Sequence, residues 1–257
     1  MPRSTIKVVI PKNPDDMLSL SGDILAKHTA DGAASVLPDD IADDLDTVHT
    51  AADLENTNQK DFYRDAENFI EQRDLVLGLH HTQDSRTENT VLFYVSSVRD
   101  VLSGLHRNNI RNLGKWGFTV NSPNNVAQVV IPLKVDRLLK LTQKILAKHT
   151  ADGAASPLPT AMMTALAALN TSALNLHDRA QDTYKSAENA TENRNKLLGL
   201  EKNQNSKTPD TVLFYITSIR TLLLGLNRGN EQNLGQWGFT VNTSGPTAPP
   251  PPPPPGP

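Results

Sequence analysis

The residues best suited to chemistry are two histidines, His28 and His149, which occur in nearly identical surroundings. Each is followed three positions later by an aspartate, Asp31 or Asp152. A histidine close to a carboxylate can act as a general base or bind a metal ion. Both histidines also fall in the last turn of a predicted helix, where an imidazole favours the negative helix end. We favour a structural role, in which the ring ties the helix end to a neighbouring segment, over a reactive one.

A second candidate is the adjacent pair His80-His81, with Asp84 nearby. Such a group is a conceivable weak transition-metal site. Glu67 and Glu71, with their counterparts Glu188 and Glu192, have the i, i+4 spacing of a carboxylate-rich helix, but the Glu-x-x-His motif of di-metal bundles is missing. We interpret the histidines as a solvated loop and the glutamates as a helix surface.

Signatures of catalysis and nucleotide binding are missing from the sequence, which contains no HExxH, GxSxG, Walker or GxGxxG pattern. The sequence also lacks cysteine, which excludes disulfides, thiolate nucleophiles and the usual structural zinc sites. We therefore expect no enzymatic activity, no catalytic residue, no metal and no cofactor.

Charge and hydropathy exclude further classes of protein. The 257 residues include 28 acidic and 25 basic side chains, a formal charge of −3 that favours no general binding to nucleic acid. No apolar run approaches the ~20 residues of a membrane span. The N-terminus has too short an apolar run for a signal peptide, which predicts a cytoplasmic protein, or an extracellular one exported by a non-standard route if it forms filaments.

The chain is a tandem duplication with an offset of 121 residues. Residues 24–38 and 145–159 share fourteen of fifteen positions, and residues 90–121 and 211–242 share 21 of 32. We call residues 1–121 copy 1 and residues 122–242 copy 2, and two residues 121 positions apart are called equivalent. Each copy has an ordinary domain size, so the sequence predicts one helical domain per copy, followed by a polyproline tail at 243–257.

Apolar spacing predicts the same helices in each copy. In copy 1 they cover about 15–29, about 39–78 and about 88–105, and the second of them has a weak point at 56–59. The third carries a coiled-coil-like seam of Val91, Val95, Val98, Leu102 and Leu105. Short β-prone segments at 6–10, 118–120, 126–131 and 239–241 are expected to pair as a small sheet. The predicted fold is mainly α: two tandem antiparallel bundles of three or four helices with minor flanking strands.

Three motifs, IP-x-NP, AKHTADGAAS-x-LP and LG-x-WGF-x-VN, resemble those of uncharacterised bacterial helical-bundle proteins. The resemblance covers both copies and excludes the tail. It implies a helical fold and assigns no activity and no site residue.

Repeated modules suit a polymer or scaffold, because each copy offers a similar contact surface. We therefore expect a structural or assembly protein, such as a filament or scaffold subunit, that binds other copies of itself. The alternatives are an adaptor that binds protein partners through a bundle face or the polyproline tail, and a bundle that binds a metal or ligand. Candidate assembly residues are Ile6, Val8 and Ile10 in the N-terminal arm, Trp116 and Trp237 in the LG-x-WGF turns, and the tail from Pro249 to Pro255.

Overall fold

The computed structural model describes residues 5–121 and 128–244, and it confirms a mainly α fold. The six α-helices are α1 (Pro14–Asp31), α2 (Asp39–Leu77), α3 (Val91–Leu105), α4 (Val135–Asp152), α5 (Thr160–Leu198) and α6 (Val212–Leu226). Short 3-10 helices are η1 (Gly32–Ala34), η2 (Ile110–Trp116), η4 (Gly153–Ala155) and η5 (Glu231–Trp237). The strands are β1 (Thr5–Val9), β2 (Thr119–Asn121), β3 (Gln128–Val130) and β4 (Thr240–Ser244).

Side-chain caps explain where several helices begin. The Asn13 side chain accepts a hydrogen bond from the Asp15 backbone amide at 2.9 Å, and Pro14 opens α1 where no backbone donor is needed. At α3, the Thr90 hydroxyl accepts from the Phe93 amide at 3.2 Å, and Thr211 does the same for α6. Each cap satisfies a backbone donor that the helix itself leaves unpaired.

Helix α2 is continuous over 39 residues, so the weak point predicted at 56–59 does not break it. Asn56 is only 5% exposed, and its amide bonds to the side chains of Asp15 and Arg194. An asparagine whose side chain is engaged elsewhere does not compete for the helix backbone, which is the usual reason that asparagine weakens helices.

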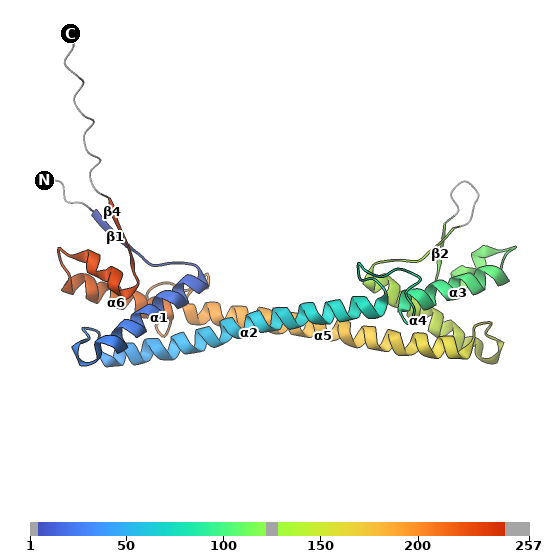
Figure 1. Cartoon of the computed structure of the whole chain (residues 1–257), viewed down its shortest axis with the longest axis horizontal. Coiled ribbons are helices and arrows are strands. Elements are labelled where there is room, and N and C mark those ends of the chain that lie inside the picture. The colour runs from blue at the N-terminus through green and yellow to red at the C-terminus, as the bar shows by residue number, and fades with distance from the viewer. Residues whose placement is uncertain (1–4, 122–127, 245–257) are drawn as a thin grey trace, which may run out of the picture. The chain divides into compact units, whose positions relative to one another are not determined.

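The chain forms two compact units that do not coincide with the two copies (Figure 1). Unit 1 comprises residues 1–60 and 187–257, and unit 2 comprises residues 61–186. The strands β1 and β4 and the helices α1 and α6 belong to unit 1, whereas β2, β3, α3 and α4 belong to unit 2. The predicted domain division at 121/122 is therefore corrected: each unit combines parts of both copies.

The hydrophobic cores show how the copies are interlocked. In unit 1, the fully buried Met17 and Ile24 of α1 share a core with Ile216 and Ile219 of α6. In unit 2, the equivalent pairing joins α4 to α3. A helix of 39 residues is about 58 Å long, so the segments at its two ends cannot share one core. The first helix of each copy therefore packs on the third helix of the other copy.

The predicted seam of the third helix is confirmed over four of its five positions. Val91, Val95, Val98 and Leu102 are fully buried, but Leu105 is 58% exposed. The equivalent residues of α6 behave in the same way, from Val212 to the exposed Leu226.

The predicted strands form two separate ribbons, and each ribbon again joins the two copies. β1 pairs antiparallel with β4, with Val8 opposite Val241. β2 pairs antiparallel with β3, with Val120 opposite the equivalent Val129. Both ribbons have the same register once the offset of 121 residues is applied.

Candidate functional site

The histidines singled out by sequence hold the turn that follows their helix. His28 Nδ1 lies 2.8 Å from the Ser35 hydroxyl oxygen, which also accepts from the Leu37 backbone amide at 3.2 Å. His149 and Ser156 repeat the contact at 2.7 Å. The aspartate three residues on bonds to a lysine instead, because Lys27 Nζ lies 2.5 Å from Asp31 Oδ1. This geometry is the one expected of the structural interpretation.

The two tryptophans are core residues at the contact between copies. Trp116 and Trp237 are 4% and 6% exposed. Lys27 of α1 lies 5.7 Å from the ring centre of Trp237, and Lys148 of α4 lies 5.6 Å from that of Trp116. The AKHTADGAAS block of one copy therefore contacts the LG-x-WGF turn of the other, and these are the two most similar blocks in the sequence. The same packing contact between these blocks occurs in both units, which accounts for their similarity.

The N-terminal arm is paired within unit 1. Ile6 and Val8 lie in β1 opposite Thr243 and Val241 of β4, and the side chains of Val8 and Ile10 pack against the unit 1 core. The other assembly candidates, Pro249 and Pro255, lie outside the described residues.

The histidine pair gains no further ligands from the fold. The His80 and His81 rings lie 4.1 Å apart, and His80 Nδ1 is 2.7 Å from the Thr82 hydroxyl. In the part of the chain that the structure describes, no three His, Asp or Glu side chains converge as a metal site would require. Over the same residues, no helix has the length and apolarity to cross a bilayer.

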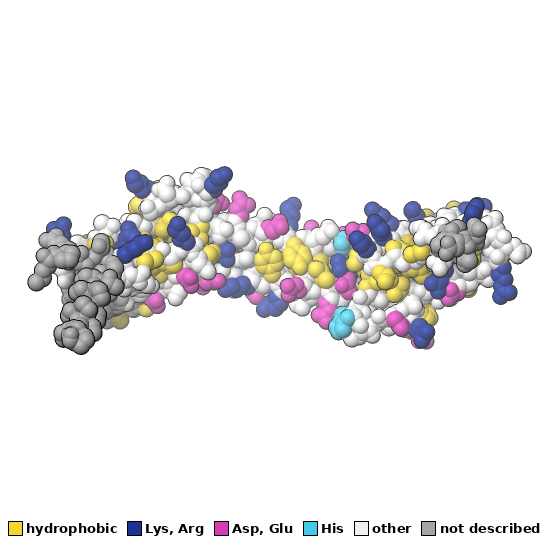
Figure 2. Space-filling model, turned by 90° about the horizontal axis from the view of Figure 1, so that it is seen from above, with side chains coloured by type: hydrophobic (Ala, Val, Ile, Leu, Met, Phe, Trp, Pro, Cys, Tyr) yellow, Lys and Arg dark blue, Asp and Glu magenta, His cyan; other side chains and the backbone are white. Residues whose placement is uncertain are grey.

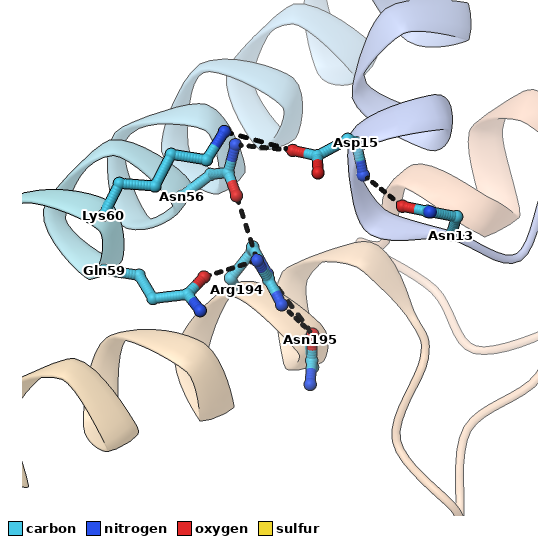
Figure 3. A network of polar contacts seen from close by, with 7 residues as sticks. All are labelled: Asn13, Asp15, Asn56, Gln59, Lys60, Arg194 and Asn195. Atoms are coloured by element: carbon cyan, nitrogen blue, oxygen red, sulfur yellow. Dashed lines mark hydrogen bonds and ion pairs between the residues drawn. The ribbon is translucent and has the colours of Figure 1, made fainter. Parts of the chain in front are cut away.

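Sequence reasoning missed a polar network in unit 1 that joins α1, α2 and α5 (Figure 3). Asn56 donates to Asp15 Oδ1 at 3.2 Å and accepts from Arg194 Nη1 at 2.9 Å. Lys60 Nζ also lies 3.2 Å from Asp15 Oδ1. The hydrogen bonds from Lys60 and then from Asn56 hold the pKa of Asp15 below its ordinary value. The buried amide of Asn56 is thus bonded to Asp15 of copy 1 and to Arg194 of copy 2.

Unit 2 contains the equivalent network with different residues. His177 replaces Asn56, and its Nδ1 lies 3.3 Å from Arg73 Nη1. His177 Nε2 lies 3.0 Å from the side-chain nitrogen of Gln181, the equivalent of Lys60. The same His177 nitrogen lies 3.8 Å from Asp136 Oδ1, beyond hydrogen-bond distance, where Asp136 is equivalent to Asp15. The only sequence signal for either network was the weak helix stretch at 56–59, which marks a polar residue inside a long helix.

Each unit has a groove at an equivalent place, and these two grooves are the surfaces from which a function can best be inferred. The groove in unit 1 has a volume of about 330 Å³ and lies between α1 and the β1–β4 ribbon. The groove in unit 2 has a volume of about 450 Å³ and lies between α4 and the β2–β3 ribbon. Shared lining positions include Gly238 with its equivalent Gly117 and Pro11 with its equivalent Pro132.

The two grooves carry opposite charge. Asp16, Ser19 and Asp23 line the first, which we call the acidic groove. The equivalent residues Arg137, Lys140 and Lys144 line the second, which we call the basic groove. All these charged side chains are exposed. Among the described residues, none of the three basic side chains has an acidic partner within 4.0 Å.

In comparisons with known proteins, no family model, no curated protein and no solved structure matches the chain. The resemblance of its motifs to bacterial helical-bundle proteins stays a prediction. Functional inference therefore depends on the geometry of the two units.

Proposed function

We propose that the protein is a structural protein that assembles head to tail with other copies of itself. The observation that carries this proposal is the opposite charge of the two equivalent grooves. Duplication by itself gives two like surfaces, and like charges repel. Divergence to opposite charge makes unit 1 of one chain attractive to unit 2 of another.

The charge balance of the whole units supports the same proposal. Unit 1 has 16 acidic and 11 basic residues, a formal charge of −5, whereas unit 2 has 12 acidic and 14 basic residues, a charge of +2. On the face displayed in Figure 2, Lys and Arg side chains lie among Asp and Glu side chains. On this face, therefore, neither unit is covered uniformly by side chains of one charge, and the difference in formal charge between the units reflects local surfaces. Contacts between unlike surfaces are heterologous, and such contacts propagate into open chains unless the rotation closes a ring.

Sedimentation velocity on the full-length protein tests the proposal. We expect the sedimentation coefficient to rise with protein concentration at low salt, and electron microscopy to show elongated particles. Salt on the order of 0.5 M should reverse the assembly, because it shortens the Debye length to a few ångströms. A monomer that persists at low salt and high concentration would contradict self-assembly and favour the adaptor, which binds a different protein.

A further inference from the structure

The geometry points to a specific pair of surfaces in this assembly: the basic groove of one chain receives the first half of α2 of another. This inference rests on the proposed self-assembly and adds the site at which it occurs. Two grooves cannot enter each other, so the acidic groove shows the sign of charge on unit 1 but is not itself the surface that the basic groove receives. The partner surface must be a ridge that bears negative charge.

The first half of α2 presents such a ridge in unit 1. Four aspartates follow the helix at successive spacings of four, three and seven residues, on a face turned away from the core, and a leucine directly follows the last of them. All five are exposed, and we call them the acidic ridge: Asp39, Asp43, Asp46, Asp53 and Leu54. Within the described residues, Asp43, Asp46 and Asp53 have no basic partner within 4.0 Å.

The ridge and the groove also match in their apolar parts. Leu54, at the end of the ridge, is 60% exposed. The basic groove offers Val130, which is 42% exposed, and Pro132 beside its three cations. Apolar side chains beside charged ones are ordinary constituents of a specific protein interface.

The equivalent surfaces give the contact a single direction. The positions on α5 equivalent to Asp39, Asp43 and Asp46 are Thr160, Thr164 and Ala167, so unit 2 lacks the ridge. Unit 1 has a groove, but its lining is acidic and would repel the ridge. Each chain therefore has one ridge and one groove that fit, and a chain with one of each propagates head to tail.

Charge reversal of each surface tests the pairing. The groove variant is Lys140→Glu with Lys144→Glu, and the ridge variant is Asp43→Lys with Asp46→Lys, both in the full-length chain. The groove variant alone should need about tenfold more protein than the wild type to assemble at low salt, because its altered groove then faces an acidic ridge. The ridge variant loses the same contact, although its new lysines can also face the native acidic groove of unit 1, so the groove variant is the decisive one. An equimolar mixture should assemble again, because the unit 2 groove of the first variant, which now carries glutamates, faces the lysines on the ridge of the second variant.

A matched control separates local from overall charge. Lys202→Glu with Lys207→Glu makes the same change in net charge on exposed unit 1 lysines outside the ridge and the groove, and should assemble like the wild type. Circular dichroism confirms that each variant is folded. If the wild type assembles and the groove variant assembles equally well, the pairing is wrong and self-assembly stands. If both variants fail alone and the mixture also fails, the groove binds a surface other than the ridge. If the wild type never assembles, the proposed function fails together with this inference.

Discussion

Asn56 and His177 are equivalent residues that share one contact and differ in another. Asn56 donates to a carboxylate and accepts from an arginine. In His177, Nδ1 lies 3.3 Å from Arg73 Nη1. Its Nε2 lies 3.0 Å from Gln181 Nε2 and 3.8 Å from Asp136 Oδ1, and the second distance is too long for a hydrogen bond. Both side chains therefore contact the arginine, but only Asn56 makes the hydrogen bond to the carboxylate.

The ionised carboxylate of Asp15 should stabilise the folded protein, and this stabilisation should be lost at low pH, where the carboxylate is protonated. The pKa of Asp15 is lowered in the folded protein, mainly by the hydrogen bond from Lys60 and then by that from Asn56. Its stabilisation is therefore fully present above the unfolded value of about 3.9 and is lost as the pH falls through the lower folded value. We expect Asp15→Asn to reduce the free energy of unfolding at pH 7 by about 0.2–1 kcal/mol, because the side chain is 63% exposed and the ion pair is screened.

Urea unfolding at pH 7 and at about pH 3 measures this effect, since the low pH protonates most carboxylates. The difference between Asp15→Asn and the wild type should shrink at the lower pH. Asp16→Asn is the control, because Asp16 lies in the same helical turn and shares its dipole but not the hydrogen bonds of Asp15. Equal effects of the two substitutions would show that the helix dipole, and not the network, stabilises the folded state.

At Gly238 the contact between copies leaves no room for a side chain. The glycine has a φ of +83°, and a Cβ there would lie 2.7 Å from Asp23 Cβ on α1. We expect Gly238→Ala to cost about 2 kcal/mol or more, from the left-handed backbone and from the displaced helix. Gly235→Ala, three residues earlier, places its Cβ in open space and should change the stability by less than about 1 kcal/mol. Urea unfolding followed by circular dichroism compares them, and similar losses would mean that α1 does not pack closely on this turn.

At the scale of elements, local signals predicted much of the structure, whereas the pairing of elements needed the fold. The Asn13 cap, the buried seam from Val91 to Leu102 and the β-prone ends were all visible in the sequence. The exchange of partners was not, because the two copies carry nearly the same apolar faces. The seam of α3 suits α1 as well as α4, so periodicity alone cannot distinguish a copy folded on itself from two copies interlocked. The grooves were missed for a related reason: they form between segments of different copies.

The exchanged packing changes what an isolated copy should do. Residues 1–121 contain α1 and α3, whose partners in the full chain are α6 and α4 of copy 2. Alone, two such copies can supply each other with these surfaces, since Val95 and Val98 are equivalent to Ile216 and Ile219. We expect residues 1–121 to form an interlocked homodimer that unfolds cooperatively, and not two independent monomers.

Equilibrium sedimentation of this fragment in high salt measures its mass without head-to-tail contacts. The full-length chain under the same conditions should be a monomer of nearly the same mass as the fragment dimer. A fragment that is folded and monomeric would show that one copy can close its own core, and that the exchange seen here is not required for folding.

At the scale of the whole molecule, the net charge conceals how different the two units are. A value of −3 arises from −5 in unit 1 and +2 in unit 2. Much of this difference comes from the acidic residues 39–60 and their nearly uncharged counterparts 160–181, on helices whose buried faces are preserved. Duplication thus kept the core contacts of both units while their outer surfaces diverged. The divergence therefore gives the two units of one chain surfaces of different charge.

The repeat also implies that the chain could begin and end at either of two equivalent places. In unit 2 the ribbon is closed by residues 122–127, which join Asn121 to Gln128. In unit 1 the equivalent pair is Asn242 and Lys7, and these strands belong to the two ends of the chain. Joining Asn242 to Lys7 with the six residues Ser-Pro-Asn-Asn-Val-Ala, which occupy 122–127, and opening the chain within 122–127, would therefore exchange the roles of the two ribbons.

We expect this circular permutant to fold, and its free energy of unfolding in urea to lie within about 1 kcal/mol of the wild type, because closing a six-residue loop replaces opening one of the same length. A permutant with the same linker, opened between Lys60 and Asp61 inside α2, is the control and should be strongly destabilised, because it interrupts a continuous helix. Circular dichroism and urea unfolding distinguish the two. If the first permutant is as unstable as the control, the β1–β4 ribbon is not the counterpart of the β2–β3 ribbon, and the two units are less alike than their registers indicate.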